Sequence, residues 1–320
     1  RYDFYAVVGH ADLNAMNLDK RGVSEIEFQT KADFTRTRSG DIFGKIDIAD
    51  LIGWNDQGRH EIGNINLTSH SNENEFRARL NSKFADGMYS GSAAMTQFVK
   101  DLKDVIAKKE MPALFADPDY DWKNNHYNVD FRFHNSMDLL DYLMPGLYIA
   151  DSTAIQASIN REGIFDAKLS SSRIAFKEQY LKGVSIAFDN TSDNLSGELE
   201  CKEMKLASMS FKDNILQVFA NDNHIGVGYR FDNNEDLINR GEIIAVGDLD
   251  RELNDIVNLD FEILPSALYL DAKEWKILPA KVRMGGGDIK VDGIEVASGE
   301  QRIRLTGETS KSQKDTMTLS

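Results

Sequence analysis

The 320-residue sequence has one cysteine, five prolines and no uninterrupted apolar run of the length that a membrane helix needs. A single cysteine forms no disulfide within the chain, which excludes a disulfide-stapled scaffold. A helix that crosses a bilayer takes about 20 consecutive apolar residues, so no such helix is predicted. Acidic residues outnumber basic ones by 52 to 37, and the formal net charge is −15. Because a phosphate backbone repels so acidic a chain, general nucleic-acid binding is not expected.

The two ends of the sequence lack features as well. No methionine and no signal sequence stand at the start, and residues 2–8 are already strand-like. Residues 315–320 still alternate where the sequence stops. Because natural termini usually fray into polar residues, we expect this sequence to be a segment of a longer protein. The missing targeting signals therefore leave the compartment undetermined.

Alternation of apolar and polar residues dominates the sequence. In residues 26–34, Ile26, Phe28, Ala32 and Phe34 share one parity, and charged or polar residues occupy the other. In residues 42–48 the isoleucines alternate with a second set that holds Phe43, Lys45 and Asp47. The pattern recurs in residues 76–81, 184–188, 225–231 and 257–263. Since successive side chains of a strand point to opposite faces, each stretch predicts a strand with one apolar and one polar face.

Polar turn clusters separate these strands, for example at residues 55–58, 71–74, 189–194 and 221–223. Many short strands joined by polar turns predict an all-β, mostly antiparallel fold. Two stretches have helical spacing instead, Met95–Ile106 and Met137–Leu143, the second followed by Pro145–Gly146. We therefore predict three parts: a first sheet segment at 1–92, a helix-containing interruption at 93–146, and a second sheet segment at 147–320.

No motif of metal or nucleotide chemistry is complete. None of the six histidines has metal-ligand spacing; at His60–Glu61 the second histidine of a zinc motif is missing, and all six are interpreted as surface or turn residues. Asp117, Asp119 and Asp121 have the spacing of a calcium loop without its glycine and its final glutamate, so a solvated acidic loop is the preferred interpretation. Neither a metal nor a cofactor is predicted.

Signals for covalent or hydrolytic catalysis are equally weak. Gly285–Gly286–Gly287–Asp288 leads into a strand and predicts a hairpin turn, not a phosphate loop. Cys201 is in phase with apolar neighbours and is expected to be a small buried hydrophobe. No nucleophile elbow occurs, and no pair of carboxylates stands out as a glycosidase pair. The sequence gives no positive sign of an enzyme.

The long apolar strand faces leave two structures open. In one, two such faces bury each other as the core of a sandwich. In the other, the sheet curls and its apolar face stays partly open to hold an apolar ligand. Alternation alone does not separate the two.

The C-terminal part carries a family resemblance. Leu259–Leu270 ends in a strand, a strand with Trp275 follows, and Asp288–Val296 and Gln301–Gly307 complete the series. This succession resembles the C-terminal region of TamB-like proteins (the translocation and assembly module subunit) of Bacteroidetes, which belong with the AsmA-like envelope proteins. Asp138–Ile149, with Pro145–Gly146–Leu147, is similar to the short helix that precedes a new sheet segment in that family.

The resemblance implies an elongated, curled sheet that forms an apolar groove like a taco, with one or two short helices inserted. It implies a periplasmic place, with an inner-membrane helix that lies outside this sequence, and a partner of the Omp85 class in the outer membrane. The implied function is non-enzymatic transport of phospholipid acyl chains between the membranes and outer-membrane biogenesis. The alternative is a chaperone-like module that receives unfolded outer-membrane proteins by strand addition.

Under this interpretation, apolar residues of the alternating strands line the groove. Those we predict are Ile26, Phe28, Phe34, Ile46, Ile48, Ile186, Phe188, Val227, Tyr229, Leu259 and Phe261. A carbohydrate-active protein is a third possibility, but it would need clustered aromatics and paired carboxylates, for which the sequence gives no sign.

Overall fold

A computed structural model describes residues 1–36, 42–72, 75–107, 110–114, 122–192, 194–207, 209–233, 238–252, 255–309 and 316–320. The fold is 68% strand and 7% helix, so the predicted all-β, mostly antiparallel class is confirmed. The chain divides into two compact units, and the segment predicted as an interruption contributes to both. Unit 1 is Arg1–Asp101, Asn124–Gly163 and Ala167–Val184, and unit 2 is Leu102–Lys123, Ile164–Asp166 and Ser185–Ser320.

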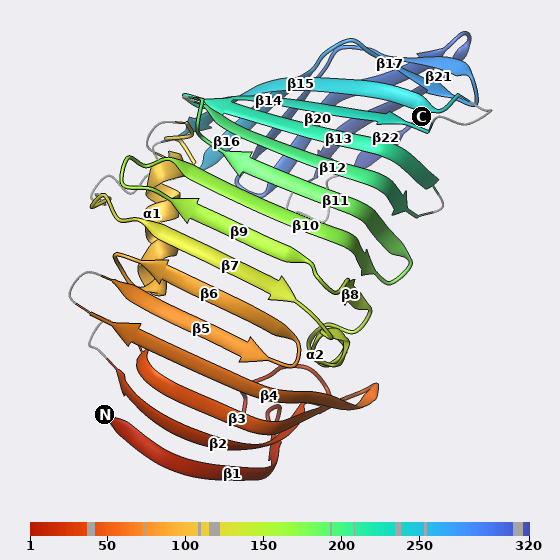
Figure 1. Ribbon diagram of the computed structural model, residues 1–320. Helices are drawn as coiled ribbons and strands as arrows, with labels where there is room; N and C mark the ends of the chain where they lie inside the picture. The colour runs from red at the N-terminus through yellow and green to blue at the C-terminus, as the bar shows by residue number, and fades with distance from the viewer. Residues whose placement is uncertain are drawn as a thin grey trace. The chain divides into compact units, whose positions relative to one another are not determined.

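Unit 1 is a meander in which most strands pair with their neighbours in chain order (Figure 1). β7 pairs next with β9, and the short β8 pairs with β10. The strands are β1 (Tyr2–Asp12), β2 (Glu25–Arg36), β3 (Ile42–Asn55), β4 (Gly58–Ser71), β5 (Phe76–Ser82), β6 (Ala85–Gly91), β7 (Tyr127–Phe133), β8 (Leu147–Ile149), β9 (Ala154–Ile159) and, for the greater part, β10 (Phe165–Phe176).

Strand register divides the unit 1 sheet into two chemically different faces. Ile46 pairs with Ala32 and with Leu67, and Leu67 pairs in turn with Leu80. Continued across the sheet, this register defines an apolar face with Phe34, Ile46, Ile48, Ile65, Leu67, Leu80, Tyr89, Val129, Phe131 and Ile155. The row on the other side runs Asp33, Lys45, Thr68, Arg79, Met88 and Asp130, and we call this side the outer face.

Helix α2 (Met137–Leu143) packs on the apolar face at one end of the strands. Its Tyr142 is buried in a cluster with Ile62, Phe84 and Ala85, and Ile26 of β2 and Phe131 of β7 both pack against that cluster. In a flat sheet, strands as far apart as β2 and β7 would be separated by roughly 24 Å. The sheet of unit 1 therefore curls around α2 with its apolar face inside.

Helix α1 (Met95–Ala107) begins in unit 1 and ends in unit 2. In unit 1, Phe98 meets the ring of Tyr127 edge-on at 5.3 Å, and the buried Asp101 accepts hydrogen bonds from the Tyr127 hydroxyl and from Asn125. The start of α1 thus covers the apolar face of β6 and β7 at the strand end opposite to α2. Both predicted helices are confirmed.

Unit 2 is also an antiparallel meander. Its strands are the end of β11 (Gln179–Asp189), then β12 (Leu195–Leu206), β13 (Met209–Asn221), β14 (His224–Asp232), β15 (Arg240–Arg251), β16 (Val257–Ile263), β17 (Ser266–Leu270), β18 (Lys273–Ile277), β19 (Ala280–Gly285), β20 (Asp288–Ser298), β21 (Gln301–Thr309) and β22 (Met317–Leu319).

Two prolines interrupt long strands of unit 2. β16 and β17 both pair with β15 and are separated at Pro265, and β18 and β19 both pair with β20 and are separated at Pro279. Proline has no N–H to donate to a ladder, so each strand breaks and resumes beside the same neighbour. The predicted turn at residues 285–288 is confirmed as the connection of β19 to β20.

Two expectations from the sequence are wrong, and one falls outside the described residues. Phe43, expected with the polar set, lies with its ring 5.6 Å from Phe76 of the apolar face. Next to it, Gly44 has φ +136°, a backbone conformation that the pattern of residue types does not reveal, although the pairing register continues through it. His60 is buried, not a surface residue. The Asp117, Asp119 and Asp121 loop lies outside the described residues. No helix in the described part of the chain is long and apolar enough to cross a membrane.

Candidate ligand-binding face

All eleven residues predicted to line a groove are half-buried: none is fully buried and none is fully exposed. Inward-facing side chains of a closed sandwich are removed from water almost completely, and those of an uncovered flat sheet are largely exposed. Among the described residues of each unit, the intermediate burial therefore fits a face that neighbouring side chains shelter in part.

In unit 1 the predicted residues lie together on β2 and β3. Phe34 pairs with Gly44, two residues before Ile46, and Ile48 pairs with Thr30 on the same face. Ile26 lies nearer to α2, against its buried cluster, and Phe28 shares its parity on β2. The apolar face continues over β4 to β9, so the predicted residues are one margin of a larger surface.

In unit 2 the predicted residues lie on three strands. Val227 of β14 pairs with Ala245, which pairs with Ile263, and Phe261 pairs with Gly247 and Val282. Tyr229 and Leu259 share these faces of β14 and β16. On β11, Phe188 meets Phe165 edge-on at 5.9 Å, and Ile186 shares its parity. These residues form a second apolar face, on unit 2.

A small cavity of about 210 Å³ opens on the apolar face of unit 1 beside the start of α1. Its walls are mostly apolar, and they come from four strands, β3 to β6, and from the start of the helix. The lining includes Phe43, Phe76, Ala78, Tyr89, Ala94 and Met95. A site of this chemistry holds apolar chains or rings, because it offers large apolar area and few groups that fix orientation.

A polar clamp fixes α2 at the other end of this face. Arg21 donates to Asp19 and, from the same guanidinium, to the backbone oxygens of Tyr142 and Leu143, with its carbon 4.8 Å from the centre of the Tyr142 ring. Hydrogen bonds from Arg21, and then from Ser24, hold the pKa of Asp19 far below its ordinary value. The helix end therefore depends on charged groups of the β1–β2 loop.

A second anchor of α2 comes from the β3–β4 hairpin. Asn55 Nδ2 donates to the backbone oxygens of Asp141 at 2.6 Å and Tyr142 at 3.2 Å. The buried His60 holds this amide in place, with its Nε2 2.9 Å from Asn55 Oδ1. His60 is thus a structural residue at the end of the apolar face.

On the apolar face of unit 2, the buried Asn214 is held by three hydrogen bonds. Asn214 donates to the backbone oxygens of Cys201 and Phe211 and accepts a hydrogen bond from the Tyr229 hydroxyl at 2.8 Å. Burial, and secondarily the neighbouring Cys201, raises the pKa of Tyr229 to about 12. Cys201 is buried, as predicted, and sits among satisfied groups. The hydrogen bonds of Asn214 join β12, β13 and β14.

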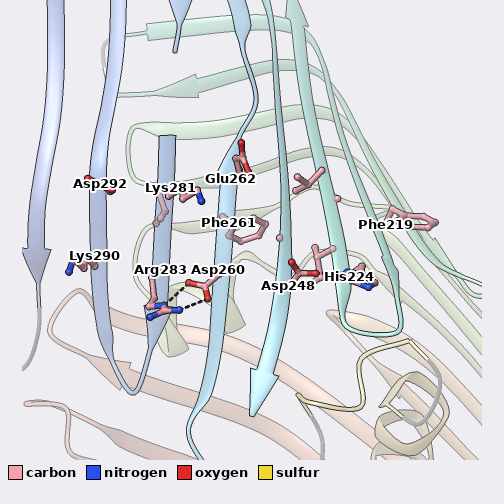
Figure 2. Close-up of a pocket in the computed structure, with 15 residues that line it drawn as sticks. Phe219, His224, Asp248, Asp260, Phe261, Glu262, Lys281, Arg283, Lys290 and Asp292 are labelled. Atoms are coloured by element: carbon pink, nitrogen blue, oxygen red, sulfur yellow. Dashed lines mark hydrogen bonds and ion pairs between the residues drawn. The ribbon is translucent and has the colours of Figure 1, made fainter. Parts of the chain in front are cut away.

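A pocket of about 700 Å³ in unit 2 has a mixed lining, in which Phe219, Ile225 and Phe261 stand beside charged side chains (Figure 2). Across its strands, Glu262 pairs with Lys281 and Lys281 with Asp292, while Asp260 binds Arg283 through two hydrogen bonds of 2.6 and 2.7 Å. Charges of both signs alternate from strand to strand. The pocket thus combines charged groups with the ring of Phe261, one of the predicted groove residues.

Reasoning from the sequence missed most of the surface that β4 to β9 contribute, including Leu67, Leu80 and Phe131. Their alternation did not distinguish them from other apolar strand residues as groove residues. Only the strand register brings them beside Ile46 and Ile48. It also missed the role of Tyr142 in covering the apolar face. The only signal for this role was an aromatic residue within a short amphipathic helix. No set of three or more His, Cys, Asp and Glu side chains fit for a metal occurs in the described ranges.

The chain was compared with protein-family models, with curated proteins and with solved structures, and no match was found in any of the three.

Proposed function

We propose that this chain is a non-enzymatic, lipid-carrying segment of a TamB-like envelope protein, placed in the periplasm, that moves phospholipid acyl chains between the inner and outer membranes. The observation that carries the proposal is the continuous, half-buried apolar face of unit 1, which spans strand after strand. The resemblance in Leu259–Gly307 supports the family and the compartment. An Omp85-class protein of the outer membrane is the proposed partner.

The face suits an acyl chain for physical reasons. Each methylene group removed from water contributes about 0.8 kcal/mol, and this attraction has no preferred direction. The strands repeat every 4.8 Å or so, and on the apolar face each presents similar aliphatic side chains. A chain lying across them meets many positions of similar energy, so it is retained and yet slides. The charged outer face keeps the sheet in water.

The cavity beside α1 gives such a ligand one enclosed contact. Phe43, Phe76 and Tyr89 surround a volume of about 210 Å³, enough for part of an acyl chain and too small for a phospholipid. The remainder of the acyl chain then lies on the open part of the apolar face. No reacting group is required for this function.

A second function, strand addition of unfolded outer-membrane proteins, is favoured by β1. Among the described residues β1 pairs with β2 alone, so its other edge offers unpaired backbone groups. Residues 4–9 contain no charge, and Tyr5 and Val7 are 64% and 60% exposed. Natural sheet edges usually carry charges or prolines that discourage pairing. This edge has the chemistry to accept an apolar strand.

The test of the lipid proposal is titration of the delipidated protein with a fluorescent long-chain fatty acid. Leu67→Asp places a carboxylate between Ile46 and Leu80 on the apolar face. Thr68→Asp, one residue on, places the same group on the outer face between Lys45 and Arg79. We expect Leu67→Asp to weaken binding by about tenfold or more, since an unpaired carboxylate disfavours apolar contact. Thr68→Asp should bind like the wild type.

Circular dichroism and urea unfolding of both variants establish that the sheet remains folded. Binding that is absent in the wild type, or that survives Leu67→Asp in a folded protein, would sink the lipid proposal. Capture of porin-derived peptides by the wild type, lost when β1 carries Val7→Pro, would instead support strand addition.

A further inference from the structure

The β10–β11 hairpin is a cationic stretch of an acidic protein. Residues 167–184 contain Lys168, Arg173, Lys177 and Lys182 against the single carboxylate of Glu178, whereas the whole chain has a formal net charge of −15. The hairpin lies in unit 1, at the strand end that carries α2 (Figure 1). It therefore presents a local positive charge to an anionic surface.

Aromatic rings hold these cations in place. The Arg173 guanidinium lies 5.1 Å from the centre of the Tyr180 ring and 5.9 Å from that of Tyr148. Lys182 Nζ is 4.5 Å from the Tyr180 ring and Lys177 Nζ is 5.3 Å from the Phe176 ring. Cation–π contacts position a cation without cancelling its charge, so the hairpin keeps its positive field.

Large apolar side chains protrude beside the cations. Leu143 and Met144 at the end of α2 are 50% and 51% exposed, and Phe176 at the hairpin tip is 44% exposed. Phe176 pairs with Leu147, and the Lys177 N–H donates to the Gly146 oxygen at 2.8 Å, so hairpin and helix end are one rigid surface. We call it the hairpin–helix surface: Leu143, Met144, Arg173, Phe176, Lys177 and Lys182.

The β1–β2 loop extends this surface. Arg21 of the loop donates to the Leu143 oxygen at 3.2 Å, and Met16 and Leu18 of the same loop are exposed. Exposed apolar side chains thus stand on three separate chain reversals at one end of the strands. Separate protruding tips enter a lipid headgroup layer more readily than they form the continuous, close-packed patch of a protein interface.

We propose that the hairpin–helix surface docks unit 1 on an anionic phospholipid bilayer. Leu143, Met144 and Phe176 enter the boundary between headgroups and acyl chains, while Lys177, Lys182 and Arg173 lie against lipid phosphates. Tyrosine, also present here, is a residue typical of that boundary. The acidic remainder of the protein is repelled, which fixes the orientation of unit 1 on the surface.

Docking here deepens the proposed function and in part rests on it. α2 covers the end of the apolar face, so a bilayer at this surface lies next to the end where an acyl chain would reach that face. Docking itself needs only the exposed side chains and cations, whereas fatty-acid binding needs the apolar face. The two properties can therefore fail independently.

Flotation of the whole chain with vesicles tests the proposal. The probe is vesicles of phosphatidylcholine and phosphatidylglycerol in equal amounts, compared with vesicles of phosphatidylcholine alone. We expect the wild type to float with the anionic vesicles, and added salt to reduce binding. Lys177→Glu should weaken binding by about tenfold or more, since each cation near an anionic surface contributes substantially. Met144→Ser should also weaken it.

Lys290→Glu is the matched control, because it makes the same charge change at an exposed side chain of unit 2. Failure of the wild type to bind anionic vesicles would overturn the proposal, and so would equal losses for Lys177→Glu and Lys290→Glu. Fatty-acid titration of the same variants separates the two proposals. Lys177→Glu should keep fatty-acid binding, and Leu67→Asp should keep vesicle docking. A protein ligand of this surface is indicated if the variants change no vesicle binding, which also overturns docking on lipid.

Discussion

Gly53 of β3 and Tyr142 of α2 are in such close contact that a β-carbon at position 53 would lie 2.6 Å from Tyr142 Cδ2. The helix can rest on the sheet because this strand position has no side chain. The contact of Gly53 with Tyr142 therefore helps to place α2 over the end of the apolar face.

Gly53→Ala should force Tyr142 outward and loosen α2. We expect the free energy of unfolding to fall by about 1–3 kcal/mol, the usual effect of overpacking. Urea unfolding followed by tryptophan fluorescence measures it. Gly9→Ala is the control, because a β-carbon there meets no atom within 4 Å. Equal stability of the two variants would show that α2 does not depend on this contact.

Asp19 makes the α2 clamp sensitive to acid. Its pKa is lowered in the folded protein, so its contribution to stability is full above the unfolded pKa of about 4 and declines as the pH falls below that value. Asp19→Asn should lower stability at neutral pH and reduce the further loss on acidification. Unfolding midpoints at neutral and acidic pH test this, with the exposed Asp250→Asn as control. An unchanged pH dependence in Asp19→Asn would refute the clamp.

Tyr229 should titrate late. With a folded pKa of about 12 against about 10 in the unfolded chain, the neutral phenol stabilises unit 2 below pH 10 or so, and this stability is lost as the pH rises toward 12. The ultraviolet absorbance of tyrosinate measures the titration, and the difference between wild type and Tyr229→Phe isolates this residue. A difference that titrates like an exposed tyrosine would contradict the burial of its hydroxyl against Asn214.

Filling the cavity beside α1 should weaken fatty-acid binding without harming the fold. Ala78 lines that cavity, and the larger side chain of Ala78→Leu would occupy part of the space otherwise available to the ligand. We expect affinity to fall by about tenfold. Fluorescence titration measures it, and thermal unfolding monitors stability. Undiminished affinity in a folded variant would show that the ligand does not use this cavity.

Much of the fold could be predicted from sequence, because alternation is a local property. The parity of Ile26, Phe34, Ile46 and Ile48 depends only on the strand geometry of their own segments, and the two helices follow from spacing alone. The prediction for Phe43 was wrong at a place where the neighbouring Gly44 adopts a backbone conformation that the pattern does not reveal. The prediction for His60 was wrong because the burial of this side chain depends on Asn55 and on a helix far along the chain.

The candidate surface was predicted less completely than the fold, for a related reason. Which strands lie side by side is set by register between segments, and α2 closes one end of the face through Arg21 and Tyr142, residues separated by more than a hundred positions. Alternation names the residues of a face, but it does not say how far the face extends.

Within each unit, nearly every strand pairs with strands close to it in the chain. An added hairpin would therefore insert between existing neighbours and lengthen the apolar face by roughly 10 Å, with no new long-range contact to invent. Loss of a hairpin would shorten it by the same step. The extent of such a face is then adjustable by duplication or deletion in units of two strands.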